Sequence, residues 1–148
     1  MIESSRLSPA LKRALDRSMP RASEQAQTRP LGFEPIGRAL GGGLAAGRLH
    51  EEVPGSPFDE ASAMGFAVML AICLTQGDAK SLPIFWLREE AAQRRTSLHG
   101  PGLVDLGLDP GRLILGVLPD AKALLRAGAD ALRCAALGVV VMELGGNS

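Results

Sequence analysis

The residues with the most recognisable chemistry lie in the run PGSPFDEASA, at 54–63. A phosphate cradle between a strand and a helix needs the spacing G-x-x-x-x-G-K-[ST], which supplies backbone N–H groups, a Lys for the β/γ oxygens and a hydroxyl for Mg²⁺. Gly55 stands for the first glycine, with Ser56 beside it. The second glycine, the Lys and the hydroxyl are missing, and Asp59 and Glu60 occupy the place of the cation. The run therefore predicts a degenerate phosphate loop.

Electrostatics decide what this degenerate loop can bind. Two carboxylates at a helix N-terminus suit the helix dipole, but they repel a triphosphate. At ~4 Å and an effective dielectric constant of about 20, each like-charge contact costs on the order of 4 kcal/mol. No Lys lies between Lys12 and Lys80 to compensate. We therefore expect no bound nucleotide or other cofactor. We also expect no metal site, because His50 and His99 are far apart in the sequence and suit structural or exposed positions.

The elements that must position this loop alternate between strands and helices. Short apolar runs predict buried strands, and helical spacing of apolar residues predicts the helices between them. Alternation of this kind indicates an α/β fold with a parallel sheet sandwiched by helices. The four expected strands are Gly47–Val53, Pro83–Leu87, Leu113–Val117 and Gly138–Leu144. The expected helices begin near Pro35, Ser56–Asp59, Glu89 and Asp120, and end near Leu40, Gln76, Leu98 and Ala135. The GGG run at 41–43 is expected to be a flexible connector, and the HGPG run at 99–102 a helix breaker.

Composition and charge bound the possible partners. The chain has 148 residues, which suits one domain, and a formal net charge of zero. Residues 1–30 carry six Arg or Lys against three acids, whereas residues 31–148 carry ten against thirteen. Cys73 and Cys134 lie in apolar helical patterns and predict buried thiols. We expect no signal peptide and no membrane span, because no apolar run approaches the ~20 residues that a span needs. The sequence thus favours a cytoplasmic protein.

Residues 1–30 are expected to form a basic amphipathic helix followed by a linker. Leu11 and Leu15 fall on one face of the helix, and Arg13 and Arg17 fall on others. One interpretation is that the leucines pack on the chain's own domain. The other is an arm for partner binding, which includes self-association and contact with nucleic acid. Direct DNA binding stays open.

Several segments together resemble RecA-type ATPases. LGFEPIGRALGGGLAAGRLHE (31–51) is similar to the segment by which that family enters its core, although Gly37 replaces the usual acidic residue. Within the superfamily it is most similar to the ImuA-like proteins of bacterial damage-inducible mutagenesis. FWLREEAAQ (85–93) resembles the strand that carries a catalytic glutamate, which would fall on Glu89. LGLDPGRLIL (106–115) resembles the lead into the next strand, and VVVMEL (139–144) would place Glu143 at the Walker B carboxylate.

The resemblance implies a RecA-like, P-loop-type core over residues 31–148. It implies the strand order 5-1-4-3-2 and further elements beyond the last strand, so we expect a domain that is incomplete at its C-terminus. It also implies a function as a non-catalytic accessory factor in SOS-induced translesion DNA synthesis. The implied partners are an ImuB-like Y-family polymerase homologue and an error-prone replicative-type polymerase.

Two alternative functions remain open at this point. One is a RecA-type ATPase with an unorthodox phosphate loop, in which Glu89 and Glu143 would be active rather than remnant residues. The other is a SulA-like cell-division inhibitor, which shares the degenerate RecA-like appearance.

Overall fold

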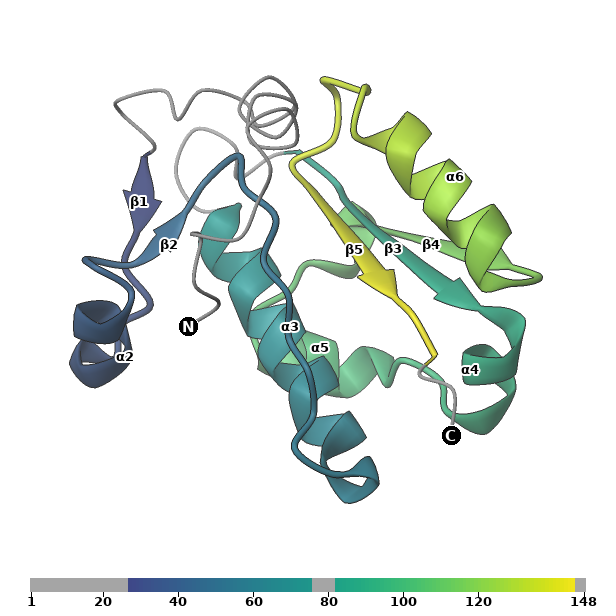
Figure 1. Ribbon diagram of the computed structural model, residues 1–148, viewed down its shortest axis with the longest axis horizontal. Helices are drawn as coiled ribbons and strands as arrows, with labels where there is room; N and C mark the ends of the chain where they lie inside the picture. The colour runs from purple at the N-terminus through teal and green to yellow at the C-terminus, as the bar shows by residue number, and fades with distance from the viewer. Residues whose placement is uncertain (1–26, 76–81, 146–148) are drawn as a thin grey trace, which may run out of the picture.

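The structure, a computed structural model, describes residues 27–75 and 82–145 (Figure 1). The predicted N-terminal helix, with Leu11, Arg13, Leu15 and Arg17, lies outside these residues. Within them, three parallel strands form the main sheet: β3 (Ile84–Glu89), β4 (Leu113–Leu118) and β5 (Val139–Glu143). The α/β class and the parallel pairing are therefore confirmed, with three described strands in the sheet rather than four.

The strand β3 lies at the centre of the sheet, in the order β4-β3-β5. Ile84 is paired with Leu113 on one side and with Val139 on the other. The expected order 5-1-4-3-2 had placed the strand Leu113–Val117 between the strands Pro83–Leu87 and Gly138–Leu144. This expectation is wrong, because the middle strand is β3. The central position suits the sequence of β3, because a strand with a neighbour on each side and a helix layer on each face needs a continuous apolar run.

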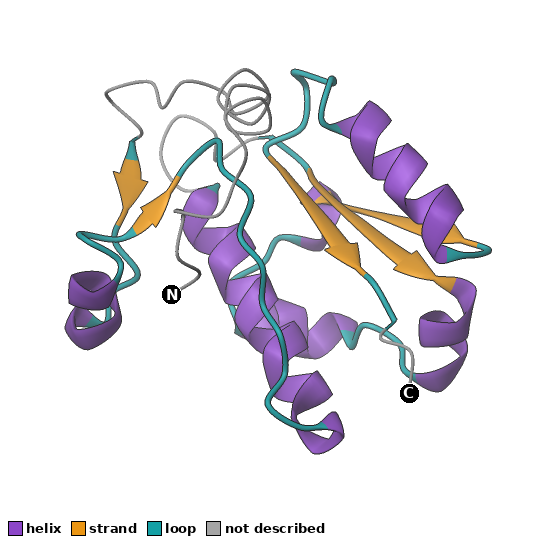
Figure 2. Cartoon of the chain, viewed as in Figure 1, coloured by secondary structure: helices purple, strands orange, loops and turns teal. Residues whose placement is uncertain are grey.

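Helices cover both faces of the sheet (Figures 1 and 2). On one face, α3 (Glu60–Leu74) and α5 (Gly100–Asp105) pack against β3, and their buried side chains form one core cluster with it. On the other face, α6 (Ala121–Ala131) packs against all three strands. The short helix α4 (Glu90–Arg95) directly follows β3. The core cluster consists of Val68, Ala71, Ile84, Trp86, Leu103 and Leu108.

The predicted strand Gly47–Val53 does not form. This stretch is irregular, and only the preceding Leu44–Ala45 forms a strand, β2, which pairs antiparallel with β1 (Thr28–Arg29). Leu49 and Val53 are both largely exposed. The physical reason is composition, since Arg, His and two Glu separate the apolar residues and Pro54 follows, so that neither face of a strand would be continuously apolar.

The glycine run at 41–43 ends α2 (Glu34–Ala39), as predicted. Gly43 has φ +139°, and a Cβ atom there would collide with the carbonyl oxygen of Arg29. The glycine thus permits the close approach of β1 and β2 that the ladder requires. The run at 41–43 thus connects α2 to β2.

The HGPG run at 99–102 starts a helix instead of breaking one. The Nδ1 atom of His99 accepts a hydrogen bond from the backbone N–H of Gly102 at 3.1 Å, which caps α5. Pro101 lies in the first turn, where its missing N–H costs nothing. The sequence prediction was wrong because a His cap followed by Pro is compatible with a helix start as well as with a loop.

The helix α6 begins as predicted, because the carboxylate of Asp120 accepts a hydrogen bond from the backbone N–H of Ala123 at 2.7 Å. It ends at Ala131, short of Ala135. From its helical spacing the sequence predicts that Leu124, Leu125 and Leu132 all point inward. Leu124 is fully buried, but Leu125 and Leu132 are 51% and 68% exposed, so this prediction is wrong for two of the three.

The 3₁₀ turn η2 (Pro57–Asp59) and α3 form a continuous helical stretch. This stretch, Pro57–Leu74, is long and apolar enough to be a candidate membrane span by length and composition, in contrast to the sequence prediction. A mostly buried core helix satisfies the same criterion, but only 11% of this stretch is buried, with Val68 and Ala71 of α3 in the core cluster. Cys73 in α3 is only half-buried and Cys134 is exposed, so the prediction of two buried thiols holds in part for Cys73 and is wrong for Cys134.

Candidate functional site

Two strand ends hold a polar cluster built around one buried ion pair. At the carboxyl end of β3, the Nη2 atom of Arg88 donates to Oε1 of Glu143, at the end of β5, at 2.9 Å. The indole N–H of Trp86 donates to the other carboxylate oxygen at 3.2 Å. In an open parallel sheet, ligands bind outside the carboxyl ends of the strands, so Glu143 lies at the edge where a ligand site would be expected. Here both of its oxygens are already engaged.

The guanidinium of Arg88 is held on several sides. It is fully buried, and besides Glu143 it donates to Oε1 of Gln93 at 3.0 Å and to Oγ1 of Thr96 at 3.2 Å. Its Nε atom has no hydrogen-bond partner among the described residues. Because a buried guanidinium keeps its charge, its desolvation must be offset by the carboxylate and these hydrogen bonds. The cluster therefore joins β3, β5 and the segment around α4.

The second predicted remnant residue, Glu89, also makes a structural contact. It is the last residue of β3 and the N-cap residue of α4, and its Oε1 atom accepts a hydrogen bond from the backbone N–H of Gly145 at 3.0 Å. This contact holds the chain after β5 against the end of β3. The structure thus brings Glu89 and Glu143 to the same edge of the sheet, with each carboxylate serving a contact of the fold.

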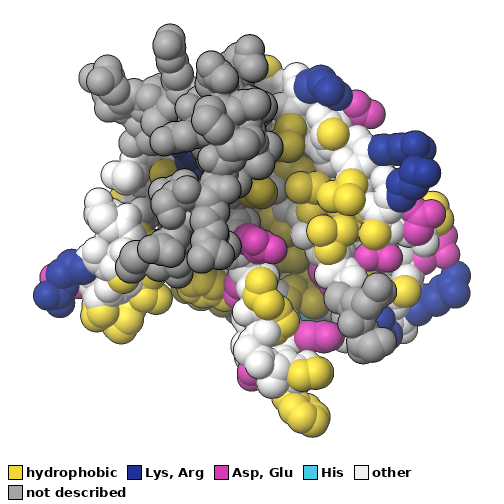
Figure 3. All heavy atoms as spheres, in the orientation of Figure 1, with side chains coloured by type: hydrophobic (Ala, Val, Ile, Leu, Met, Phe, Trp, Pro, Cys, Tyr) yellow, Lys and Arg dark blue, Asp and Glu magenta, His cyan; other side chains and the backbone are white. Residues whose placement is uncertain are grey.

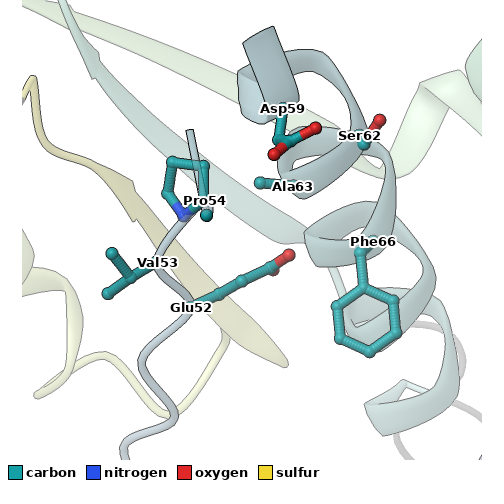
Figure 4. Close-up of a pocket in the computed structure, with 8 residues that line it drawn as sticks. Glu52, Val53, Pro54, Asp59, Ser62, Ala63 and Phe66 are labelled. Atoms are coloured by element: carbon teal, nitrogen blue, oxygen red, sulfur yellow. The ribbon is translucent and has the colours of Figure 1, made fainter. Parts of the chain in front are cut away.

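The degenerate phosphate loop borders an open pocket of about 320 Å³ at the start of α3 (Figure 4). The Oγ atom of Ser56 donates to Oδ2 of Asp59 at 2.8 Å, so the hydroxyl is used within the loop. The lining holds two carboxylates and no Lys or Arg. Glu60, the first residue of α3, is not among the lining residues, which are Glu52, Val53, Pro54, Gly55, Asp59, Ser62, Ala63 and Phe66. Of the two acids that the sequence assigned to this place, Asp59 lines the pocket, whereas the second lining carboxylate is Glu52 rather than Glu60.

The carboxylate of Glu52 titrates differently from an ordinary Glu. Partial burial in the pocket raises its pKa above the usual value of 4.5. The folded state then retains this proton at a pH where the unfolded chain has released it, so the contribution of Glu52 to stability falls as pH rises above 4.5 through the raised pKa.

Replacing Glu52 by Gln is therefore expected to reduce the loss of stability between acid and neutral pH. The measurement is urea unfolding at a series of pH values, with Glu51→Gln as the matched control, because Glu51 is the neighbouring acid but does not line the pocket. An identical pH dependence for wild type and Glu52→Gln would contradict the proposed desolvation.

Sequence reasoning missed the central residue of the polar cluster, Arg88. One signal was present, because Arg88 shares the alternation of Ile84 and Trp86 and so lies on the face that packs against α3 and α5. A charged residue at a core-facing position requires a buried partner, but the expected strand order placed the strand Leu113–Val117 between Arg88 and Glu143, so this partner was not found. His50, predicted to be structural or exposed, is exposed and lies with its Nε2 atom 2.8 Å from the carbonyl oxygen of Ala45.

Comparison with known proteins identifies no relative of this chain. No protein-family model matches the chain, and no curated protein or solved structure matches it significantly.

Proposed function

We propose that the chain is a non-catalytic, RecA-like accessory factor in SOS-induced, error-prone translesion DNA synthesis, and that it acts in the cytoplasm through protein–protein contacts. The fold assignment rests on the order of the motifs over 31–146 and on the parallel α/β core. The absence of catalysis rests on one observation above all. The carboxylate of Glu143, which a RecA-type ATPase would need for its metal, is bound on both oxygens by Arg88 and Trp86.

Three further features support the loss of nucleotide chemistry. The carboxylate of Glu89 is bound to Gly145, the hydroxyl of Ser56 is bound to Asp59, and the pocket beside them is acidic. Hydrolysis of a nucleoside triphosphate needs a metal-holding carboxylate, a residue that orients water and cations around the phosphates. Among the described residues, acids stand in place of the phosphate-binding cation, and the carboxylates of Glu143 and Glu89 are both engaged in contacts of the fold.

The surface at the start of α3 supports a role in protein contacts. Phe58 is 96% exposed, and Phe66 and Met69 continue the apolar surface along the helix. Figure 3 shows hydrophobic side chains projecting over this end of α3. Exposed aromatic residues are enriched at the centres of protein interfaces, where a few of them carry most of the binding energy. By the resemblance, the partners are an ImuB-like Y-family polymerase homologue and an error-prone replicative-type polymerase.

The test is direct binding of the purified chain to an ImuB-like polymerase homologue, measured by calorimetry. Saturable binding of the wild type is expected, and Phe58→Ser is expected to raise Kd at least ~10-fold, in line with loss of an aromatic anchor. Leu49→Ser is the matched control, because Leu49 is similarly exposed but lies outside the continuous helical stretch Pro57–Leu74. Failure of the wild type to bind would contradict the proposed function, and equal affinity of Phe58→Ser would contradict the contact surface.

A further inference from the structure

The outer edge of β4 has no pairing strand among the described residues, and its side chains are unusually apolar for such a position. Ile114, Leu115 and Val117 are 47%, 42% and 42% exposed. Because successive side chains of a strand point to opposite faces, this exposure occurs on both faces of the sheet. An edge strand of this kind offers unsatisfied backbone N–H and C=O groups together with apolar side chains.

The sequence of β4 lacks the usual protection against edge pairing. LILGVL contains no charged residue and no Pro, and the nearest charges are Arg112 before it and Asp120 after it. The Nη2 atom of Arg112 donates to the carbonyl oxygen of Leu82 at 2.7 Å, so its charge is engaged within the chain. The other edge strand, β5, differs, because all of its side chains are half-buried and it ends in the charged Glu143. Free edges normally carry charges, prolines or bulges that prevent pairing.

We propose that β4 pairs antiparallel with β4 of a second copy of the chain, about a two-fold axis at Leu115. A two-fold axis through the sheet keeps each face continuous, so residues that lie opposite each other must point to the same face. Centring the axis on Leu115 pairs Leu113 with Val117 and Ile114 with Gly116 of the second copy. Ile114, a bulky side chain of the face that α6 covers, is thus opposite a glycine.

The neighbouring registers fit less well. Centring the axis on Gly116 places Leu113 opposite Pro119, which has no N–H to donate to the ladder. Centring it on Ile114 pairs only residues 113–115 within both strands and brings Pro110 opposite Leu118. The Leu115 register pairs Leu113 to Val117 with itself, and the Gly116 register pairs Ile114 to Leu118 with itself. The Leu115 register is preferred because its next pair, Arg112 opposite Leu118, keeps both backbone N–H groups, whereas the next pair of the Gly116 register includes Pro119.

A second copy is the occupant that the chemistry favours. An isologous interface requires a self-complementary surface, and an uncharged strand with an alternation of bulky residues and one glycine provides it. The product is a continuous sheet of six strands, in the order β5-β3-β4-β4-β3-β5, with the new antiparallel pair at its centre. The outer apolar surface at the start of α3 is a separate feature and stays free for another partner.

The first test is the mass of the full chain in solution, by sedimentation over a concentration series to roughly 100 µM, a range suited to a small interface. A mass rising to that of a dimer is expected. Leu115→Lys is expected to remove the dimer, because it places two like charges opposite each other. A monomer at every concentration overturns the proposal, as does a dimer that Leu115→Lys leaves intact.

Mixing two charge variants separates repulsion from misfolding. Leu115→Lys and Leu115→Glu are each expected to be monomeric, whereas an equal mixture is expected to restore a dimer through the opposite charges at the axis. Emission of the buried Trp86 reports whether each variant is folded. A mixture of folded variants that stays monomeric overturns the proposal.

Cross-linking tests the register, in a chain that also carries Cys134→Ser to remove an exposed native thiol. Leu115→Cys places two thiols directly opposite each other, at a Cα separation compatible with a disulfide. Val117→Cys is the matched control, because its two copies would lie about 14 Å apart along the strands. Rapid oxidation to a covalent dimer is expected for Leu115→Cys alone. Equal cross-linking of both variants overturns the Leu115 register.

Discussion

Replacing Glu143 by Gln is expected to destabilise the fold by about 3 kcal/mol, although Glu143 lies at the end of an edge strand. The change preserves the shape of the side chain but removes the charge that neutralises Arg88. The guanidinium is fully buried, whereas the Glu143 side chain is 25% exposed, so the cost arises mainly from leaving the buried cation without its counter-charge. The measurement is the free energy of unfolding in urea, followed through Trp86 and far-UV circular dichroism.

The chain contains a matched control for this experiment. Glu34 and Arg38 form an ion pair of the same length, 2.9 Å, but both side chains are more than 70% exposed. Glu34→Gln is expected to change the free energy of unfolding by less than ~0.5 kcal/mol, because exposed ion pairs are screened by water. Equal effects of Glu143→Gln and Glu34→Gln would show that the buried pair is not an anchor of the fold.

A double variant separates the loss of the pair from the loss of either residue. Arg88→Met with Glu143→Gln removes both charges while the stem of residue 88 still fills its place. It is expected to be less destabilised than the sum of the two single variants, because neither charge is then left uncompensated. Strict additivity of the two single effects would contradict a direct coupling between Arg88 and Glu143.

Truncating Leu124 to Ala is expected to cost about 2–5 kcal/mol. Leu124 is fully buried on α6, which covers one face of the sheet, so the change removes apolar contacts and leaves a cavity between helix and strands. Gly128, one turn further along α6, lies against the side chain of Met142, which shows how closely this helix and β5 are packed. Urea unfolding again provides the measurement.

The neighbouring Leu125 supplies the control, with the same residue type in the same helix. It is 51% exposed, and Leu125→Ala is expected to change the free energy of unfolding by no more than ~0.5 kcal/mol. If the two variants were equally destabilised, the orientation of α6 described here would be wrong.

The parts of the fold that sequence reasoning predicted correctly are those with a local cause. The strands β3, β4 and β5 are short apolar runs between turn signals, and α6 begins at an Asp that caps it. The GGG run at 41–43 ends a helix because glycine reaches backbone conformations that other residues avoid. Each of these features is decided within a few residues of the chain.

The features that sequence reasoning missed depend on contacts between distant segments. The stretch Gly47–Val53 is an exception, because the charged residues between its apolar ones already disfavour a strand in the sequence itself. The orientation of Leu125 depends on where α6 lies relative to the sheet, which the helical spacing alone does not determine. The pairing of Arg88 with Glu143 joins residues 55 positions apart. The acidic character of the loop at Gly55–Glu60 was predictable, because it follows from composition.

The most direct test of the central claim, that this α/β domain has lost nucleotide chemistry, is titration of the full chain with Mg²⁺-ATP, followed by Trp86 emission and by calorimetry. Trp86 is the only tryptophan of the chain, and its indole N–H is bound to Glu143, so a metal that engaged this carboxylate would alter its emission. No saturable change in emission and no heat of binding are predicted up to millimolar nucleotide. Saturable binding of Mg²⁺-ATP at micromolar concentration, with a matching change in Trp86 emission, would contradict the claim.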